Sequence, residues 1–373
     1  MSYFLTEEQI LMRNTVKEFA EGEVRNRIAE IEKSNQFPLD LWKRCAELGL
    51  TGIAVDEKFG GLGLDVTTEL LVMEELAKEL PALALILDAH MLGMRVLEMY
   101  ANEEQKQKYL VPGATGEKIS AFGITDPAGS SNFSEWTPLG VFDGDEIVLN
   151  NTKLYVTNSQ VADFYIFNGF IDGTLCYVII DKGTPGLEDG HIEHKMGLAG
   201  TSTGTVSLRN VRVPKANYMA ITKPPVNQNI CFLNITVIAL GLAEAALEKT
   251  KQFVLNRTRM GQPLASFQVV AHHIAEMATK IEFSRNMIYN AAKLFDEGTP
   301  NVMLARMAKA KIPDWVVEIT SQCIQLHGGA GYCVDTGIER YMRDAKGLCI
   351  GEFPTDCHYD VIALQLGMPI KTT

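Results

Sequence analysis

The sequence predicts an α+β protein with an N-terminal helical domain over residues 1–118, a central antiparallel β domain over 119–222 and a C-terminal four-helix bundle over 223–373. Apolar residues recur at helical spacing at both ends of the chain, whereas the middle holds short runs rich in Val, Ile, Phe and Tyr. The length of 373 residues is also long for one core, which favours several domains. With 46% hydrophobic and 21% charged residues, the composition is that of an ordinary globular protein.

The first 118 residues are predicted to be helical. Thr6 followed by Gln9 is a capping box at the start of the first helix. Two later helices fit residues 66–79 and 82–101. In the second of them, Asp88 interrupts the apolar run ALALILDAHML. A charged side chain is costly in a core, so Asp88 either turns outward or lines a cavity.

The central and C-terminal parts differ in their periodicity. Asp-Gly pairs at 143–144 and 172–173 each lie between strand-like runs, which predicts two β-hairpins. Beyond the Pro-Pro pair at 224–225 the helical period returns. Short connections between long helices favour an antiparallel bundle. The long helices fit residues 229–256, 265–295 and 301–327.

Charge and cysteine usage exclude several classes of function. The formal net charge of −12 argues against nucleic acid as a partner. The seven cysteines are scattered without a C-x-x-C pair, which indicates reduced thiols and neither disulfides nor a metal site. The N-terminus lacks a signal-peptide pattern, and no uninterrupted apolar run approaches the roughly 18 residues of a membrane span. We therefore expect a cytoplasmic protein without a membrane span.

One carboxylate near the end of the helical region is a candidate for chemistry. Glu352 lies in RDAKGLCIGEFPTDCHYD, residues 343–360, directly before a stiff Phe-Pro pair. Taken alone, it has the pattern of an ordinary surface acid. A functional interpretation of Glu352 depends on its distance from four other sequence blocks: GITDPAGSSNFS at 123–134, KLYVTN at 153–158, RTRMGQPLASFQ at 257–268 and QLHGGAGY at 325–332.

In this order and spacing, over nearly the whole chain, the blocks resemble the acyl-CoA dehydrogenase family of flavoproteins. The resemblance implies FAD as cofactor and an acyl-CoA substrate that is dehydrogenated to an enoyl-CoA. It also implies an electron-transfer flavoprotein as the partner that receives the electrons. Glu352 then corresponds to the base that removes the proton next to the thioester carbonyl. A carboxylate screened from water has a raised pKa, which matches it better to a weakly acidic C–H.

The resemblance also implies residues that contact FAD. Tyr155 and Thr157 are two apart on a predicted strand and so share one face, although an ordinary half-buried strand has the same pattern. In the family this block lies against the flavin. Thr125 and Ser131 occupy the contact positions of the flavin- and phosphate-binding loop.

A second group of residues is implied to reach the FAD of a neighbouring subunit. Arg257 offers a planar fork of donors suited to a pyrophosphate. In the family, residues matching Arg257, Gln268, Gln325 and Gly329 contact the cofactor of the adjacent chain. A shared cofactor requires association, so the resemblance implies a homo-oligomer, usually a tetramer in this family.

The chain departs from the family pattern around the substrate. Phe353 and Pro354 stand where the family usually has Gly-Thr, and Asn229 and Phe232 replace an acid and an arginine around the CoA part. Cys231 occupies the base position of a few relatives. An acyl-carrier-protein substrate is therefore an alternative to CoA.

Asp88 is a second candidate for a base. Its place in the family lines the far part of the acyl pocket, where it could meet a polar or cationic acyl group. Members that handle alicyclic acyl-CoAs, such as cyclohexene-carboxyl-CoA, use an aspartate from this helix. Two further alternatives are an enoyl-CoA reductase running the same chemistry backwards and a flavin-binding member without activity. The sequence does not identify the acyl group.

Overall fold

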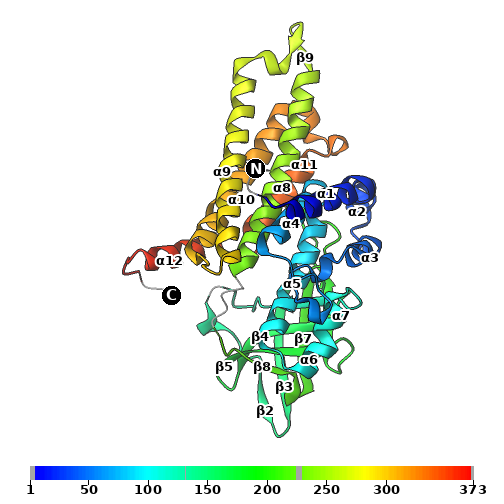
Figure 1. The fold of residues 1–373 in the computed structure, drawn as a ribbon, viewed down its shortest axis with the longest axis vertical. Helices are drawn as coiled ribbons and strands as arrows, with labels where there is room; N and C mark the ends of the chain where they lie inside the picture. The colour runs from blue at the N-terminus through cyan, green and yellow to red at the C-terminus, as the bar shows by residue number, and fades with distance from the viewer. Residues whose placement is uncertain (1–4, 131, 224–228, 371–373) are drawn as a thin grey trace.

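A computed structural model describes residues 5–130, 132–223 and 229–370 of the chain. Figure 1 shows the sheet at one end of an elongated molecule and the tip of the helical bundle at the other. The predicted order of helices, sheet and helices is confirmed. The helical N-terminal part lies between the two ends and carries the helix that bears Asp88.

The N-terminal helices begin where the sequence places their caps. The Thr6 side chain accepts a hydrogen bond from the Gln9 backbone N–H, and the Gln9 side chain accepts one from the Thr6 N–H, so the capping box is confirmed. Pro81 occupies the first turn of the helix containing Asp88. The helices are α1 (Glu7–Phe19), α2 (Ile28–Ser34), α3 (Leu39–Glu47), α4 (Val66–Glu79), α5 (Pro81–Tyr100), α6 (Glu103–Gln105) and α7 (Val111–Ala114).

The central sheet has the strand order β6-β7-β3-β2-β4-β5-β8, with β1 beside β4. Most of its strand pairs are antiparallel, as the sequence predicts, but the sheet is mixed because β1 and β2 both pair with β4 in parallel. Strand β1 enters directly from the helical domain and is separated from β4 by the β2–β3 hairpin, so no tight turn forces it to run antiparallel. The strands are β1 (Ser120–Gly123), β2 (Gly140–Asp143), β3 (Glu146–Val156), β4 (Phe164–Ile171), β5 (Thr174–Asp181), β6 (Leu187–Ile192), β7 (Gly204–Pro214) and β8 (Tyr218–Ala220).

Both predicted hairpins form. Asp172 and Gly173 are the two turn residues between β4 and β5, and both have a positive φ, as a tight two-residue hairpin turn requires. In the other hairpin Asp143 still pairs with Glu146. That turn therefore centres one residue later than the sequence predicts.

Helices α8 to α11 pack against one another as the predicted four-helix bundle, and α12 projects from its side in Figure 1. Helix α8 is long and apolar enough to cross a membrane by length and composition alone, although polar residues interrupt its apolar sequence. Most of its apolar stretch is buried inside the protein, however, so it is a core helix here. The elements are α8 (Ile230–Asn256), β9 (Thr258–Arg259), β10 (Gln262–Pro263), α9 (Gln268–Asp296), α10 (Val302–His327), α11 (Glu339–Ile350) and α12 (Thr355–Gln365).

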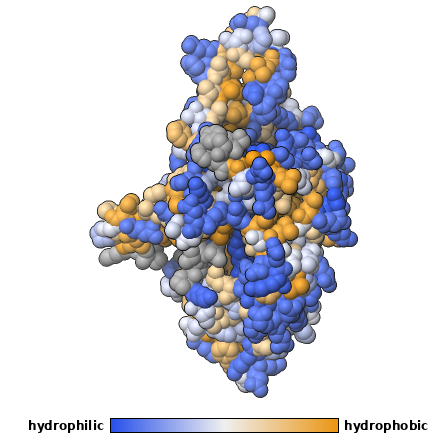
Figure 2. All heavy atoms as spheres, in the orientation of Figure 1, coloured by the Kyte–Doolittle hydropathy of each residue, from blue (hydrophilic) through white to orange (hydrophobic). Residues whose placement is uncertain are grey.

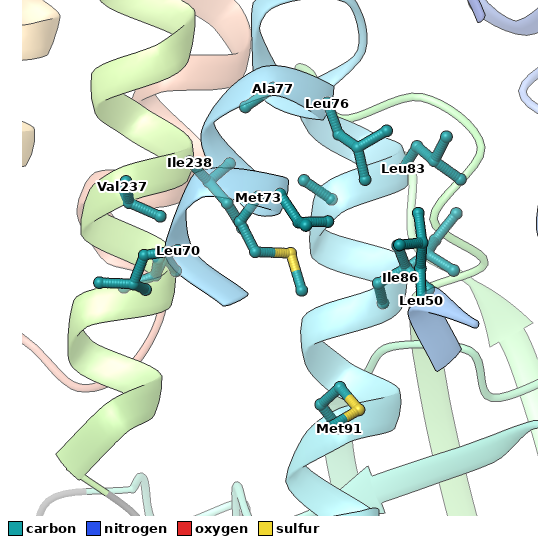
Figure 3. Packing of buried hydrophobic residues seen from close by; sticks show 14 of the residues in the cluster. Leu50, Leu70, Met73, Leu76, Ala77, Leu83, Ile86, Met91, Val237 and Ile238 are labelled. Atoms are coloured by element: carbon teal, nitrogen blue, oxygen red, sulfur yellow. The ribbon is translucent and has the colours of Figure 1, made fainter. Parts of the chain in front are cut away.

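The main core lies where α4, α5 and α8 meet, and Figure 3 shows buried side chains of the three helices packed together. Helix α8 comes very close to α4 at Gly241. A Cβ at this position would lie 2.4 Å from the backbone oxygen of Glu74 and 3.1 Å from the Cβ of Ala77. The spacing of the two helices therefore depends on a glycine.

We predict that Gly241→Ala lowers the free energy of unfolding by about 1–3 kcal/mol, because the backbone of α4 must move to admit a methyl group. Chemical denaturation measures the loss. Gly22→Ala is the matched control, since a Cβ there meets no atom within 4 Å and should leave stability unchanged or slightly raised. Equal stability of the two variants would contradict the packing described for α8 and α4.

Candidate active site

Glu352 lies in the short connection between α11 and α12. Glu352 has φ 54° and Phe353 has φ 71°, so two successive residues other than glycine adopt the left-handed conformation. Such a residue costs about 1–2 kcal/mol relative to the right-handed region. A glycine at 353, as the family usually has, would adopt this φ freely. The chain accepts this strain at the position of the candidate base.

The side chain of Glu352 lies beside α8 and α10, and the residue is partly exposed. Burial raises the pKa of its carboxyl, while a hydrogen bond from the Cys231 thiol and the charge of Lys309 act in the opposite direction. Burial also raises the pKa of Cys231 well above its ordinary value, so that residue is a neutral thiol donor. A screened carboxyl with one nearby cation is the environment that a carbon-proton base needs.

Asp88 turns inward, which decides between the two orientations that the sequence leaves open. Its side chain is buried on α5, and the Asn234 side-chain amide donates one hydrogen bond to Asp88 Oδ1 and one to Glu69 Oε1, each of 2.8 Å. Glu69 also forms a buried ion pair with Arg95. The other oxygen, Asp88 Oδ2, has no hydrogen-bond partner among the residues that the structure describes.

Asp88 and Glu352 are within electrostatic reach of each other. Burial raises the pKa of Asp88 to about 8, and the negative charge of Glu352 adds to this increase, whereas the hydrogen bond from Asn234 opposes it. At neutral pH the Asp88 carboxyl is therefore mostly protonated. The charge on Glu352 therefore influences the protonation of Asp88 across the space between α5 and the α11–α12 connection.

Two buried polar residues fasten α5 to the sheet. The Asn158 side-chain amide donates to the carbonyl oxygens of Ile86, at 3.1 Å, and Ser120, at 3.3 Å. His90 Nδ1 accepts from the Ser120 backbone N–H at 3.1 Å, and burial lowers the pKa of His90 to about 4, so the ring is neutral. These contacts fix the helix that carries Asp88 against β1.

The predicted flavin-side residues gather at the end of β3. The Leu154 backbone N–H donates to the Thr125 carbonyl at 2.9 Å, Tyr155 is 63% exposed, and Thr157 is partly buried. The expectation that Tyr155 and Thr157 share one strand face is wrong, because β3 ends at Val156 and Tyr155 has φ 55° at a register shift with β7. Ser131 lies outside the described residues.

A buried ion pair holds the loop that contains Thr125. Lys153 is fully buried on β3, and its Nζ lies 3.7 Å from Asp126 Oδ2 and donates to the Ile124 carbonyl at 3.2 Å. Burial lowers the pKa of Lys153 to about 8. Sequence reasoning did not single out this lysine, although a charged residue facing the core of a strand run is a visible signal.

The second predicted FAD group lies at the tip of the bundle. Arg257, Gln268, Gln325 and Gly329 are all exposed there. The ends of α8 and α10 near Arg257 and Gln325 adjoin, since the rings of Phe253 and His327 stack with centroids 4.2 Å apart. Figure 1 shows this tip and the sheet at opposite ends of the molecule.

The tip is suited to contact with another molecule. A Cβ added at Gly329 would meet no atom within 4 Å, so the packing of this chain does not require a glycine there. Arg257 forms no ion pair with any residue that the structure describes, which leaves its guanidinium available for a pyrophosphate. The residues present therefore fit FAD, in two groups that a single chain does not bring together.

The tip also exposes apolar side chains. Figure 2 shows hydrophobic atoms on the visible face of this end. The exposed apolar side chains in this part of the bundle are Leu255, Met260, Val269, Tyr332 and Val334.

Several residues around the carboxyls escaped the sequence analysis. Asn234 interrupts the apolar run ICFLNITVIALGL much as Asp88 interrupts its own, so the same reasoning could have found it. Lys309 and His358 gave no comparable signal. Only the fold shows that both approach Glu352.

Comparisons with known proteins agree with this arrangement. Three family models match the chain: the acyl-CoA dehydrogenase N-terminal domain over residues 6–117, the middle domain over 121–211 and the C-terminal domain over 233–367. The short-chain specific acyl-CoA dehydrogenase of Clostridium acetobutylicum is 35% identical over 357 residues, which cover 93% of this chain and 94% of that protein.

Two solved structures are similar over almost the whole chain. Butyryl-CoA dehydrogenase from Megasphaera elsdenii is 31% identical with a TM-score of 0.93, covering 97% of this chain and 98% of that one. A chain in a structure reported for the electron transferring flavoprotein of Acidaminococcus fermentans is 34% identical with a TM-score of 0.93 and the same coverage. The chain thus belongs to the acyl-CoA dehydrogenase family, whose members are FAD-dependent oxidoreductases acting on the CH–CH group of acyl-CoA thioesters.

Proposed function

We propose that this protein dehydrogenates an acyl-CoA thioester to the 2-enoyl-CoA with Glu352 as the base. The observation that supports this role is the position of the Glu352 carboxyl beside Cys231 and Lys309, on a strained connection between two helices. Burial raises the pKa of the carboxyl, and a base with a raised pKa is better matched to the weakly acidic proton next to a thioester carbonyl.

In this mechanism, Glu352 removes the proton from the carbon next to the carbonyl and holds it on its carboxyl. The backbone N–H of Glu352 donates to the thioester oxygen, where negative charge develops. FAD, when bound, supplies the two-electron acceptor. The packing around the Glu352 carboxyl raises its pKa and so brings its basicity nearer to the useful range.

The cofactor would be held by two chains. Thr125, Ser131, Tyr155 and Thr157 would contact the FAD of their own subunit. Arg257, Gln268, Gln325 and Gly329, at the opposite end, would reach the FAD of a neighbour. We infer a homotetramer, which the exposed apolar side chains at the bundle tip support.

The electrons would pass to an electron-transfer flavoprotein. The similarity to a chain in the structure reported for such a flavoprotein from A. fermentans supports this partner. The residues that the structure describes contain no cluster of His, Cys, Asp and Glu able to hold a metal ion.

A second candidate function assigns the base to Asp88, with an alicyclic acyl-CoA as substrate. The observation that favours it is the buried Asp88 carboxyl, whose Oδ2 lacks a partner among the described residues and whose pKa of about 8 suits proton transfer near neutral pH. The two candidates differ in which carboxyl faces the reacting carbon.

We predict that Glu352→Gln slows anaerobic flavin reduction on the order of 10²- to 10⁴-fold, the usual contribution of a general base. A panel of straight, branched and cyclic acyl-CoAs provides the substrates, and bleaching of the flavin is the signal. Asp88→Asn is the matched variant, because an asparagine side chain can still accept the bond from Asn234. Full activity of the Glu352 variant together with an inactive Asp88 variant would transfer the role of base to Asp88.

We also predict that Arg257→Gln weakens FAD binding by about 10- to 100-fold, because a charge-assisted hydrogen bond to the cofactor is lost. Retention of FAD on gel filtration, followed by titration, measures the change. Arg259→Gln removes the same charge two residues away in the same exposed hairpin and should retain the cofactor. Equal FAD loss in both variants would mean that only the general charge of the tip matters.

A further inference from the structure

Lys309 fastens the segment that leads into Glu352. It lies on α10, is 1% exposed, and its Nζ donates to the Cys349 carbonyl oxygen at 3.2 Å. Cys349 belongs to the last turn of α11, where carbonyl oxygens lack helical partners and a positive charge is favourable. Lys309 thus fixes the end of the helix from which Glu352 emerges.

His358 fastens the same segment from the other side. It lies on α12 and is fully buried, and its Nε2 donates to the backbone oxygen of Glu352 at 3.0 Å. Burial lowers the pKa of His358 to about 4, so the ring is neutral and carries its proton on Nε2. Phe232 packs edge-on against the ring with centroids 4.8 Å apart.

The hydrogen bonds from Lys309 and His358 hold a backbone conformation that residues other than glycine disfavour. Glu352 and Phe353 are both left-handed, and neither is a glycine. Released from its neighbours, the segment would relax to a more favourable φ and carry the carboxyl away from α8 and α10. Such strain persists only where the surrounding structure determines the conformation.

Lys309 has an electrostatic role that His358 lacks. Cys231 from α8 and Lys309 from α10 act on the Glu352 carboxyl, and Asp88 from α5 is within electrostatic reach of it. The neutral His358 from α12 contacts the Glu352 backbone oxygen. The Cys231 thiol is neutral, and Asp88 is mostly protonated at pH 7. The hydrogen bond from Cys231 and the charge of Lys309 both favour the ionised form of Glu352, and of these two groups only Lys309 is charged.

We propose that Lys309 and His358 are positioning residues for the base: both hold Glu352 in its left-handed conformation, and the ammonium of Lys309 also keeps its carboxyl ionised. This inference rests on the proposed role of Glu352. A pH profile can separate the two contributions, because only one of the two groups is charged.

The first experiment measures the pH dependence of single-turnover flavin reduction in the FAD-loaded protein, with the acyl-CoA of the panel that bleaches it fastest. We expect Lys309→Met to move the acid limb of the rate profile upward by about one pH unit, since loss of a nearby cation raises the pKa of Glu352. At pH values below the pKa of Glu352, the rate of Lys309→Met should then be about tenfold lower than that of wild type. Lys309→Arg retains the charge and should keep the limb in place.

Lys311→Met is the matched control, because Lys311 lies on the same helix and instead approaches the Trp315 ring, 5.7 Å from its centroid. Its profile should equal that of wild type. An unmoved limb in Lys309→Met, or an equal shift in Lys311→Met, would overturn the electrostatic role. If Glu352→Gln remained fully active, the proposed base itself would be refuted, which is a distinct result.

The second experiment tests the hydrogen bond from the uncharged His358 ring to the Glu352 backbone oxygen. We expect His358→Phe to lower kcat at least tenfold without moving the acid limb, and His358→Gln, whose amide can donate to the same carbonyl, to recover most of the rate. A shifted limb in His358→Phe, or an equal loss of rate in both variants, would overturn the positioning role. Thermal unfolding of each variant separates a folding defect from a catalytic one.

Discussion

The burial of carboxyl groups between helices is the constraint on which the rest of the structure depends. Removing an isolated ionised carboxylate from water costs several kcal/mol unless hydrogen bonds or opposite charges compensate. Each acid around the site, fully buried in the case of Glu69 and Asp88 and partly buried in the case of Glu352, has a specific partner: Arg95 for Glu69, Asn234 for Asp88, and Lys309 with Cys231 for Glu352. The acids and their partners come from different helices, so the acids can be accommodated only when α4, α5, α8, α10 and α11 are in register. A slip of one helix would leave a buried charge unpaired.

The same constraint explains how rigid the surroundings are. Gly241 permits α8 to approach α4 closely, and Asn158 fixes α5 to β1. These contacts are far apart in sequence but act on the two helices that carry Asp88 and Asn234. A carboxyl whose protonation state depends on two or three neighbours is useful only if those neighbours do not move. Precise packing of the core is therefore a condition for the chemistry as well as for stability.

Much of the fold could be predicted because it depends on local patterns. The capping box at Thr6 and the turn at Asp172 each depend on a few adjacent residues, and both were confirmed. The parallel pairing of β1 depends on partners distant in sequence, so local patterns could not show it. The site divides in the same way. Lys309 and Lys311 are indistinguishable in the run AKAK, and only the packing of α10 against α11 selects the first to face Glu352.

The separation of the two predicted FAD groups is a question of geometry that one chain cannot resolve. Thr125 and Thr157 belong to the sheet, and Arg257 and Gln325 belong to the tip of the bundle, at opposite ends of the molecule in Figure 1. No adjustment of side chains could bring both ends of one rigid chain to the same cofactor. If both groups bind FAD, the tip must lie against the sheet of another copy. Association would then be part of the active site, because each base would depend on a cofactor held in place by the neighbouring chain.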